Sequence, residues 1–158
     1  MPDRQRPAVA NGFQSSSALL IIDSFAALTG RPLVDGLVGA DSAGEKLYHA
    51  PFVVLAHDTA SDPVFFYANL AAQELFELDW PQFVALPSRL SAEPLAREER
   101  ARLLARVSRD GYIDDYAGIR ISASGRRFRI TGATVWNLIA AGSRYQGQAA
   151  MFSRWARC

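Results

Sequence analysis

The sequence predicts an α+β domain in which helices cover an antiparallel sheet. The first observation is a set of apolar runs with the period of two that is typical of strands, separated by turn-forming residues. The second is a group of segments with helical spacing and recognisable start and stop signals between these runs. The chain has 158 residues, of which 49% are hydrophobic, so it suits a single domain with a substantial core.

Charge and cysteine usage exclude several classes of protein. Seventeen basic and sixteen acidic residues leave a net charge of +1, which gives no general attraction to nucleic acid or to an anionic membrane. No run reaches the roughly 18 apolar residues of a membrane-spanning helix. The only cysteine is Cys158, so disulfide scaffolds within one chain are excluded. We expect a cytoplasmic protein with neither a membrane nor a nucleic-acid partner.

The N-terminal region is expected to contain a flexible tail, residues 1–16, followed by the domain, residues 17–158. Ser17 precedes an apolar segment and Gly30 follows it, which predicts a capped helix over 18–28. Leu20 and Ile21 lie away from the main apolar stripe of this helix. The helix therefore packs either across its own domain or between two copies of the chain.

The central part of the chain alternates between short helices and strands. Ser42 and Glu45 have the spacing of a capping box and predict a helix over 43–49, which would place His49 in its last turn, where the helix dipole favours a histidine. An antiparallel hairpin is expected next, followed by a helix that Asn69 caps. The strands are predicted at 51–58 and 63–69, and the helix at 70–78.

The second half of the chain carries the remaining helices and strands. Asp79 starts a helical turn, residues 86–94 form a connector, and the longest helix is expected over 94–109. Glycine-containing turns separate the last three strands, which are predicted at 112–123, 126–140 and 145–155. In the middle one, Phe128 and Ile130 alternate with arginines, which is typical of a strand with one buried face.

This order of elements, with PVFFYANLAAQELFEL at the second strand and its helix, resembles the layout of PAS domains. The segments PFVVLAHDTASDPVFFYANLAAQELFELDW, LPSRLSAEP, GYIDDYAGIRISASGRRFRI and FSRW resemble, more specifically, the stand-alone bacterial type of the MEKHLA domain family, which is PAS-like. The resemblance covers residues 18–156. It implies a five-stranded antiparallel sheet of order 2-1-5-4-3, with helices over one face that enclose a pocket and with an additional N-terminal helix.

Strand parity and helix placement indicate which residues would line this pocket. The expected apolar walls are Phe128, Trp136, Leu103 and Val107. The expected polar anchors are Tyr116, Asn137, Ser88 and Arg89. Arg89 would either clamp a carboxylate ligand or form a structural ion pair with Glu93 or Asp115.

The resemblance leaves the cofactor open. A photosensory LOV-type adduct needs a cysteine near the helical cluster, and the only cysteine stands at position 158. Haem held by a histidine of the long helix is disfavoured because residues 94–109 contain none, which leaves His49 and His57 as remote alternatives. A flavin held without a covalent bond would stack on Trp80, Trp136 or Tyr116.

Catalysis and nucleic-acid binding both find little support in the sequence. No known catalytic motif is present, and Asp114 and Asp115 are strand neighbours that point to opposite faces. A small enzyme would require a buried His57 beside an open cleft. Arg127 and Arg129 share a strand face, and Arg120 and Arg126 complete a basic group. A solvated sheet edge, or salt bridges to Asp114 and Asp115, would explain this group.

The expected function is therefore a non-enzymatic sensory or regulatory module. It would bind a small molecule, whose identity the sequence does not give, and signal by population shift through a homodimer or a protein partner in trans. The alternative is a ligand-free dimerisation module whose interior is filled by its own aromatic side chains.

Overall fold

The computed structural model describes residues 4–34 and 40–158, and its centre is an antiparallel sheet. Five strands follow the order β2-β1-β5-β4-β3, and a sixth, β6, pairs with β4 beyond the end of β5. The strands are β1 (Val53–His57), β2 (Phe65–Ala68), β3 (Tyr112–Ile121), β4 (Arg127–Ala140), β5 (Arg144–Phe152) and β6 (Arg154–Arg157). The expected order of strands is confirmed.

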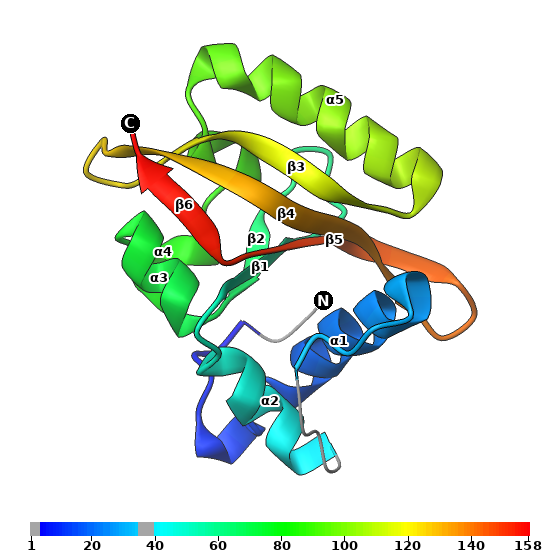
Figure 1. The fold of residues 1–158 in the computed structure, drawn as a ribbon. Helices are drawn as coiled ribbons and strands as arrows, with labels where there is room; N and C mark the ends of the chain where they lie inside the picture. Colours follow the sequence, from blue (N-terminus) through cyan, green and yellow to red (C-terminus); the bar gives the residue numbers. More distant parts are fainter. Residues whose placement is uncertain (1–3, 35–39) are drawn as a thin grey trace.

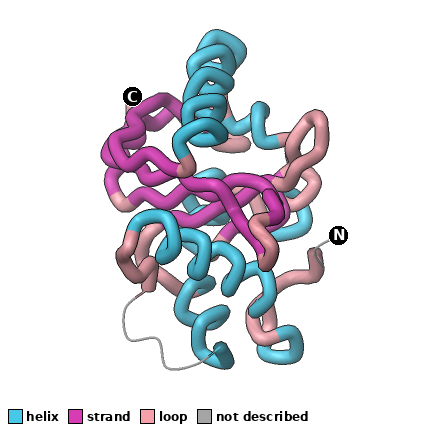
Figure 2. The backbone as a smooth tube through the Cα atoms, turned by 90° about the vertical axis from the view of Figure 1, so that its right-hand side faces the viewer, coloured by secondary structure: helices cyan, strands magenta, loops and turns pink. Residues whose placement is uncertain are grey.

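Helices cover both faces of this sheet (Figures 1 and 2). The α5 face lies under α3 (Leu70–Phe76), α4 (Trp80–Phe83), a 3-10 turn (Ser88–Ser91) and α5 (Pro94–Asp110). The opposite side, the α1 face, is covered by α1 (Ser15–Thr29) and α2 (Ala40–Tyr48). Both faces of β1 and β2 are consequently covered, which explains why these strands are apolar, apart from His57, rather than alternating.

Helix α1 starts earlier than the sequence predicts and packs within its own chain. Gln14, in a left-handed conformation, precedes its first residue, so Ser17 is inside the helix and is not its cap. Similarly, α2 begins at Ala40, so Ser42 is not a cap either. The Phe25 ring meets the Trp136 ring edge-on at 4.9 Å, and Ser24 bonds to the backbone of β4. The helix therefore covers the sheet of its own subunit.

Residues 4–14, expected to belong to a flexible tail, lie against the domain. The Arg4 guanidinium donates to the carbonyl oxygens of Phe65 and Val84 and forms an ion pair with Asp58 at 2.6 Å. The Trp80 indole donates to the carbonyl oxygen of Arg4 at 2.9 Å. These contacts fasten the N-terminal segment beside the β1–β2 turn, and residues 1–3 lie outside the described residues.

Asn69 caps α3 as predicted and also connects three other segments. Its Oδ1 accepts hydrogen bonds from the backbone N–H groups of Ala72 and Val54, and its Nδ2 donates to the carbonyl oxygens of Leu47 and Phe52. The side chain is completely buried. One amide therefore satisfies four backbone groups where α2, β1 and α3 meet.

A bulge in β4 changes which residues face α5. Ile130 pairs with Gly118 and Ala133 with Tyr116, so β4 uses three steps where β3 uses two, and Gly132 between them has φ of 63°. An extra residue in a strand turns every side chain that follows it to the opposite face of the sheet. Phe128 and Ile130 therefore share the α5 face with Val135, whereas Trp136 turns to the α1 face.

No described helix has the length and apolarity needed to cross a bilayer.

Candidate functional site

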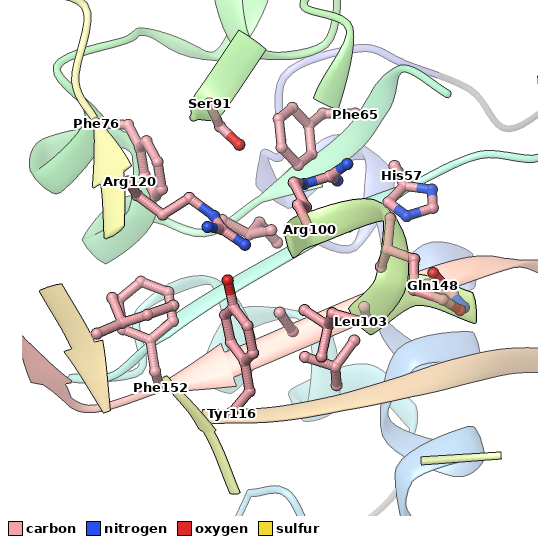
Figure 3. A pocket seen from close by; sticks show the side chains of 16 residues that line it. His57, Phe65, Phe76, Ser91, Arg100, Leu103, Tyr116, Arg120, Gln148 and Phe152 are labelled. Atoms are coloured by element: carbon pink, nitrogen blue, oxygen red, sulfur yellow. The ribbon is translucent and has the colours of Figure 1, made fainter. Parts of the chain in front are cut away.

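The structure contains a cavity of about 50 Å³ between the sheet and α5 (Figure 3). Its walls are mainly apolar and include Leu55, Phe65, Phe76, Leu103, Ile130 and Phe152. Six polar side chains also line it: His57, Ser91, Arg100, Tyr116, Arg120 and Gln148. An apolar chamber with a few converging polar groups is the usual form of a small-molecule site.

Two arginines from different elements extend into this cavity. Arg100 comes from α5 and Arg120 from β3. Figure 3 shows the Arg120 guanidinium between Ser91 and Tyr116, and the Arg100 guanidinium beside Phe65 on the side of His57. Burial lowers the pKa of Arg100 to about 10, and the neighbouring Arg120 charge contributes to the shift. The Arg100 guanidinium is therefore still cationic at neutral pH.

Arg120 is held in place by its own strand. It is only 8% exposed, its Nη1 donates to the carbonyl oxygen of Ile119 at 2.9 Å, and its Cζ lies 5.2 Å from the centre of the Tyr116 ring. Residues 116, 118 and 120 are every second residue of β3, so they point to the same face of the sheet. Arg120, expected at a solvated edge, is thus an interior residue.

His57 is buried at the end of β1, and its pKa is lowered. Burial lowers the pKa of His57 and outweighs the opposing effect of its hydrogen bond to the backbone of Asp58. Nδ1 lies 3.0 Å from the carbonyl oxygen of Asp58, and because that oxygen can only accept, Nδ1 carries the proton. Nε2 is buried and accepts no hydrogen bond of standard geometry from the described residues, although the Gln148 side chain lies close enough to oppose the lowering of the His57 pKa.

A hydrogen-bonded chain joins the cavity to α5. The Gln148 side-chain Nε2 donates to the Leu104 carbonyl oxygen, to Ser108 Oγ and to Asn137 Oδ1 at 3.2, 3.3 and 3.1 Å. Asn137 Nδ2 in turn donates to the Val107 carbonyl oxygen at 3.0 Å. The last turns of α5 are consequently attached to β4 and β5 beside the cavity.

Among the residues predicted for the pocket, Tyr116 and Leu103 line the cavity. Val107 is buried in the cluster behind Leu103, and Phe128 is buried against the Phe76 ring at 5.2 Å. Asn137 contacts the cavity only through Gln148.

Trp136 differs most from its expected position. Its indole packs against Phe25 on the α1 face and donates to the Ile21 carbonyl oxygen at 3.3 Å. Phe128 and Trp136 are an even number of residues apart, so regular strand alternation predicted that both face the pocket. The bulge at Gly132 overturns that prediction, because the extra residue turns the side chains that follow it to the other face.

Ser88 and Arg89, the two connector residues predicted as polar anchors, lie outside the cavity lining. Ser88 is buried and its Oγ has no partner among the described residues, while its carbonyl oxygen accepts from Ser91 Oγ at 2.7 Å. Arg89 is half-exposed and pairs with Asp62 at 3.1 Å, rather than with Glu93 or Asp115. Arg89 is therefore a surface ion-pair residue.

The sequence contained weak signals for the two arginines that it did not assign to the pocket. Arg100 precedes Leu103, Leu104 and Val107 at helical spacing, so it shares their buried stripe. Arg120 shares strand parity with Tyr116. A long charged residue on an apolar face is a departure from the usual pattern that marks a functional candidate.

The cavity residues do not fit a flavin. A cavity of about 50 Å³ is several-fold smaller than the roughly 300–1,000 Å³ of pockets for drug-sized ligands. Of the three stacking candidates only Tyr116 lines it, because Trp136 packs on α1 and Trp80 packs against Tyr48 and Tyr67. Cys158 is exposed and does not line it.

Histidines do not form a metal centre in the part of the chain that the structure describes. His49 is exposed, and its Nδ1 contacts the Glu45 carbonyl oxygen at 3.0 Å in the last turn of α2. No group of three or more His, Cys, Asp or Glu residues in residues 4–34 and 40–158 is arranged to hold a metal ion.

Solved structures share this fold at low sequence identity. The PAS domain of a protein from Colwellia psychrerythraea has a TM-score of 0.60 and 10% identity, and the match covers 72% of this chain and 92% of that chain. A fungal LOV domain photoreceptor has a TM-score of 0.60 and 15% identity over 96% and 100% of the two chains. The light-state dimer of the fungal blue-light photoreceptor Vivid has a TM-score of 0.58 and 10% identity over 87% and 90%.

These likenesses establish a PAS/LOV-like fold. None of the curated proteins matches the sequence. The comparison with protein families does give a match, and it extends over residues 15–157, nearly the whole chain. The N-terminal helix, the sheet and the helices around the cavity all lie within that range, and the protein belongs to the MEKHLA domain family.

Proposed function

We propose that the protein is a non-enzymatic sensory module that binds a small molecule in the cavity beneath α5 and passes the signal to a dimer or partner contact. The observation that supports this proposal is the cavity itself, which has six polar side chains within an otherwise apolar interior. A module that only filled a core would have no need of buried polar groups, which destabilise a core unless they are paired.

The last residue of β5, together with β6, offers a route from the cavity to the surface. Phe152 lines the cavity at the end of β5, and its ring meets the Trp155 ring at 5.9 Å in an edge-on arrangement. Trp155 belongs to β6, whose residues are all exposed, and is itself 40% exposed. A ligand that shifts Phe152 would alter the packing of this strand, where a partner can detect the change.

The proposal is tested by native mass spectrometry of the purified protein, with an absorption spectrum of the same sample. Mass in excess of the polypeptide that disappears after denaturation supports a bound small molecule. If adding that molecule changes the tryptophan fluorescence of the wild type but not that of a Trp155→Phe variant, the response is assigned to β6. A bare polypeptide that changes neither fluorescence nor oligomeric state with any small molecule tested contradicts the proposal.

The competing proposal is a ligand-free dimerisation module. Its support is the packing of Phe128 on Phe76 and of Trp136 on Phe25, which fills much of the interior. It predicts a stable dimer whose assembly no small molecule changes. A small enzyme is the third candidate, because His57 is buried and lines the cavity, and it predicts chemical conversion of the bound molecule.

The dimer contact can be sought on the outer side of α1. Leu20 and Leu28 are partly exposed and border a surface groove with Ile139 of β4, whereas Ile21 is completely buried. Leu20→Ser therefore probes assembly while it leaves the completely buried Ile21 in place. A dimer measured by light scattering that becomes a folded monomer places the contact at α1, and an unchanged dimer places it elsewhere.

A further inference from the structure

The chemical class of the ligand is indicated by the charges in the cavity. Arg100 and Arg120 both point into it, and neither guanidinium lies within salt-bridge distance of a carboxylate in the part of the chain that the structure describes. The four ion pairs found there involve other arginines, and all lie outside the cavity lining. A buried charge without a counter-charge destabilises a fold strongly.

From this geometry we infer that the cavity binds a small organic carboxylate, clamped by Arg100 and Arg120. The inference rests on the proposed ligand-sensing function and specifies what is sensed. Guanidinium groups match a carboxylate through paired N–H donors, and two of them lining one small chamber attract an anion more strongly than one would. Burial reduces the screening of these charges by water, which strengthens the attraction.

The rest of the lining restricts the ligand further. The walls beside the arginines are the Phe65, Phe76 and Phe152 rings, which favour a short carbon chain over a bare inorganic ion. The cavity of about 50 Å³ admits only a few heavy atoms unless its walls move. A carboxylate of a few carbon atoms satisfies both restrictions.

His57 gives the ligand a second recognition point. Its Nε2 can only accept, and it lines the same cavity without a donor among the described residues. A hydroxyl group on the ligand would supply that donor. A short-chain hydroxy carboxylate thus complements the arginines through its anionic end and His57 through its hydroxyl.

The test uses the full chain and four probes: 2-hydroxybutyrate, butyrate, the uncharged butyramide and inorganic phosphate, each at matched ionic strength. Binding is measured by calorimetry and by the thermal midpoint. We expect the two carboxylates to bind, the hydroxylated one more tightly, and a saturating carboxylate at about 100 times its Kd to raise Tm by about 5 °C or more. Butyramide is expected to bind at least about tenfold more weakly.

Arg100→Met is the decisive variant, because it keeps an unbranched apolar stem and removes the guanidinium, with both its charge and its N–H donors. It is expected to weaken carboxylate binding by about tenfold to a hundredfold and to raise Tm of the ligand-free protein, because a half-buried cation with no carboxylate partner among the described residues is lost. Arg102→Met is the matched control, because Arg102 lies on the same helix but is exposed. It should change neither binding nor Tm appreciably.

Each result separates this inference from the broader proposal. Binding of butyramide as tight as that of butyrate, unaffected by Arg100→Met, overturns the carboxylate inference and leaves the sensory function standing. Binding of phosphate alone overturns it in favour of an inorganic anion. A fall in Tm of ligand-free Arg100→Met shows that the arginine is a paired structural residue and overturns it as well. Failure of every probe, together with a bare mass, contradicts both proposals.

Discussion

Gly118 leaves the space that the Tyr116 side chain occupies. A Cβ atom added at Gly118 would overlap the phenol oxygen and the ring of Tyr116, two residues earlier on the same face of β3. The ring lies over the strand in that space, and the Arg120 guanidinium, two residues beyond, faces it at 5.2 Å from the ring centre. A missing side chain thus determines the position of the tyrosine that lines the cavity.

Gly118→Ala should therefore move Tyr116 rather than distort the backbone, because Gly118 has an ordinary φ. We expect a loss of about 1–3 kcal/mol in the free energy of unfolding. In a Tyr116→Ala background the same substitution should cost almost nothing, giving a coupling energy of about 1 kcal/mol or more in a urea-unfolding double-mutant cycle. Additive effects of the two substitutions would show that the overlap with Tyr116 is not the cause of the cost of Gly118→Ala.

Gly147→Ala should be the most damaging of the glycine substitutions beside the cavity. Gly147 has φ of 130°, and an added Cβ would overlap the carbonyl oxygen of His57 on the neighbouring strand. We expect a loss of about 3 kcal/mol or more, because the backbones of β1 and β5 must separate. Gly125→Ala is the control, since it has φ of 87° but no atom within 4 Å of the added Cβ. If thermal unfolding shows the same loss of stability for Gly147→Ala and Gly125→Ala, the loss is due to the backbone conformation alone and not to the overlap with His57.

The Arg4–Asp58 ion pair should contribute measurably to stability despite its place near the chain terminus. Burial raises the pKa of the Asp58 carboxyl, but hydrogen bonds from the backbone of Val64 and Ala60 and from Arg4 outweigh it and lower the pKa. We expect Arg4→Met to cost about 1–3 kcal/mol at neutral pH. Arg6→Met is the matched control, because Arg6 is exposed.

The sign of the pH dependence follows from the lowered pKa of Asp58. A carboxyl whose pKa falls on folding stabilises the protein above its unfolded pKa, and this contribution is lost as the pH falls through the folded value. The difference between wild type and Asp58→Asn should therefore shrink below about pH 3.8. Urea unfolding at several pH values measures it, and a difference that stays constant or grows in acid would be contrary to this assignment.

His57 should make the protein less stable in mild acid. Its pKa is lowered on folding, so the unfolded chain binds a proton at a higher pH than the folded one does. The free energy of unfolding should decline as the pH falls through about 6.5, and the decline should level off below the folded pKa.

Comparison of wild type with His57→Gln between about pH 7.5 and 5 isolates this contribution, because His49 is common to both proteins. The variant should show a weaker decline over this range. An identical decline in the two proteins would indicate that folding does not lower the pKa of His57.

Local sequence signals were sufficient for most of the elements. The hairpin, the Asn69 cap and the Gly30 stop of α1 depend on neighbours in the chain, and the structure confirms each of them. The start of α1 was wrong by three residues, because a left-handed Gln14 ends the preceding turn and no side-chain cap announces the helix. The fastening of Arg4 was also hidden, since its partners are 54 to 80 residues away.

Local patterns in the chain were enough to predict the α+β class and two residues of the cavity lining, Tyr116 and Leu103, and the family resemblance implied the strand order. The other features depend on contacts between distant segments. Parity holds only along an uninterrupted strand, so the bulge at Gly132 sent Trp136 to the α1 face. Burial of a charge depends on which elements pack over it, and only the placement of α5 on the sheet brought Arg100 and Arg120 into one cavity.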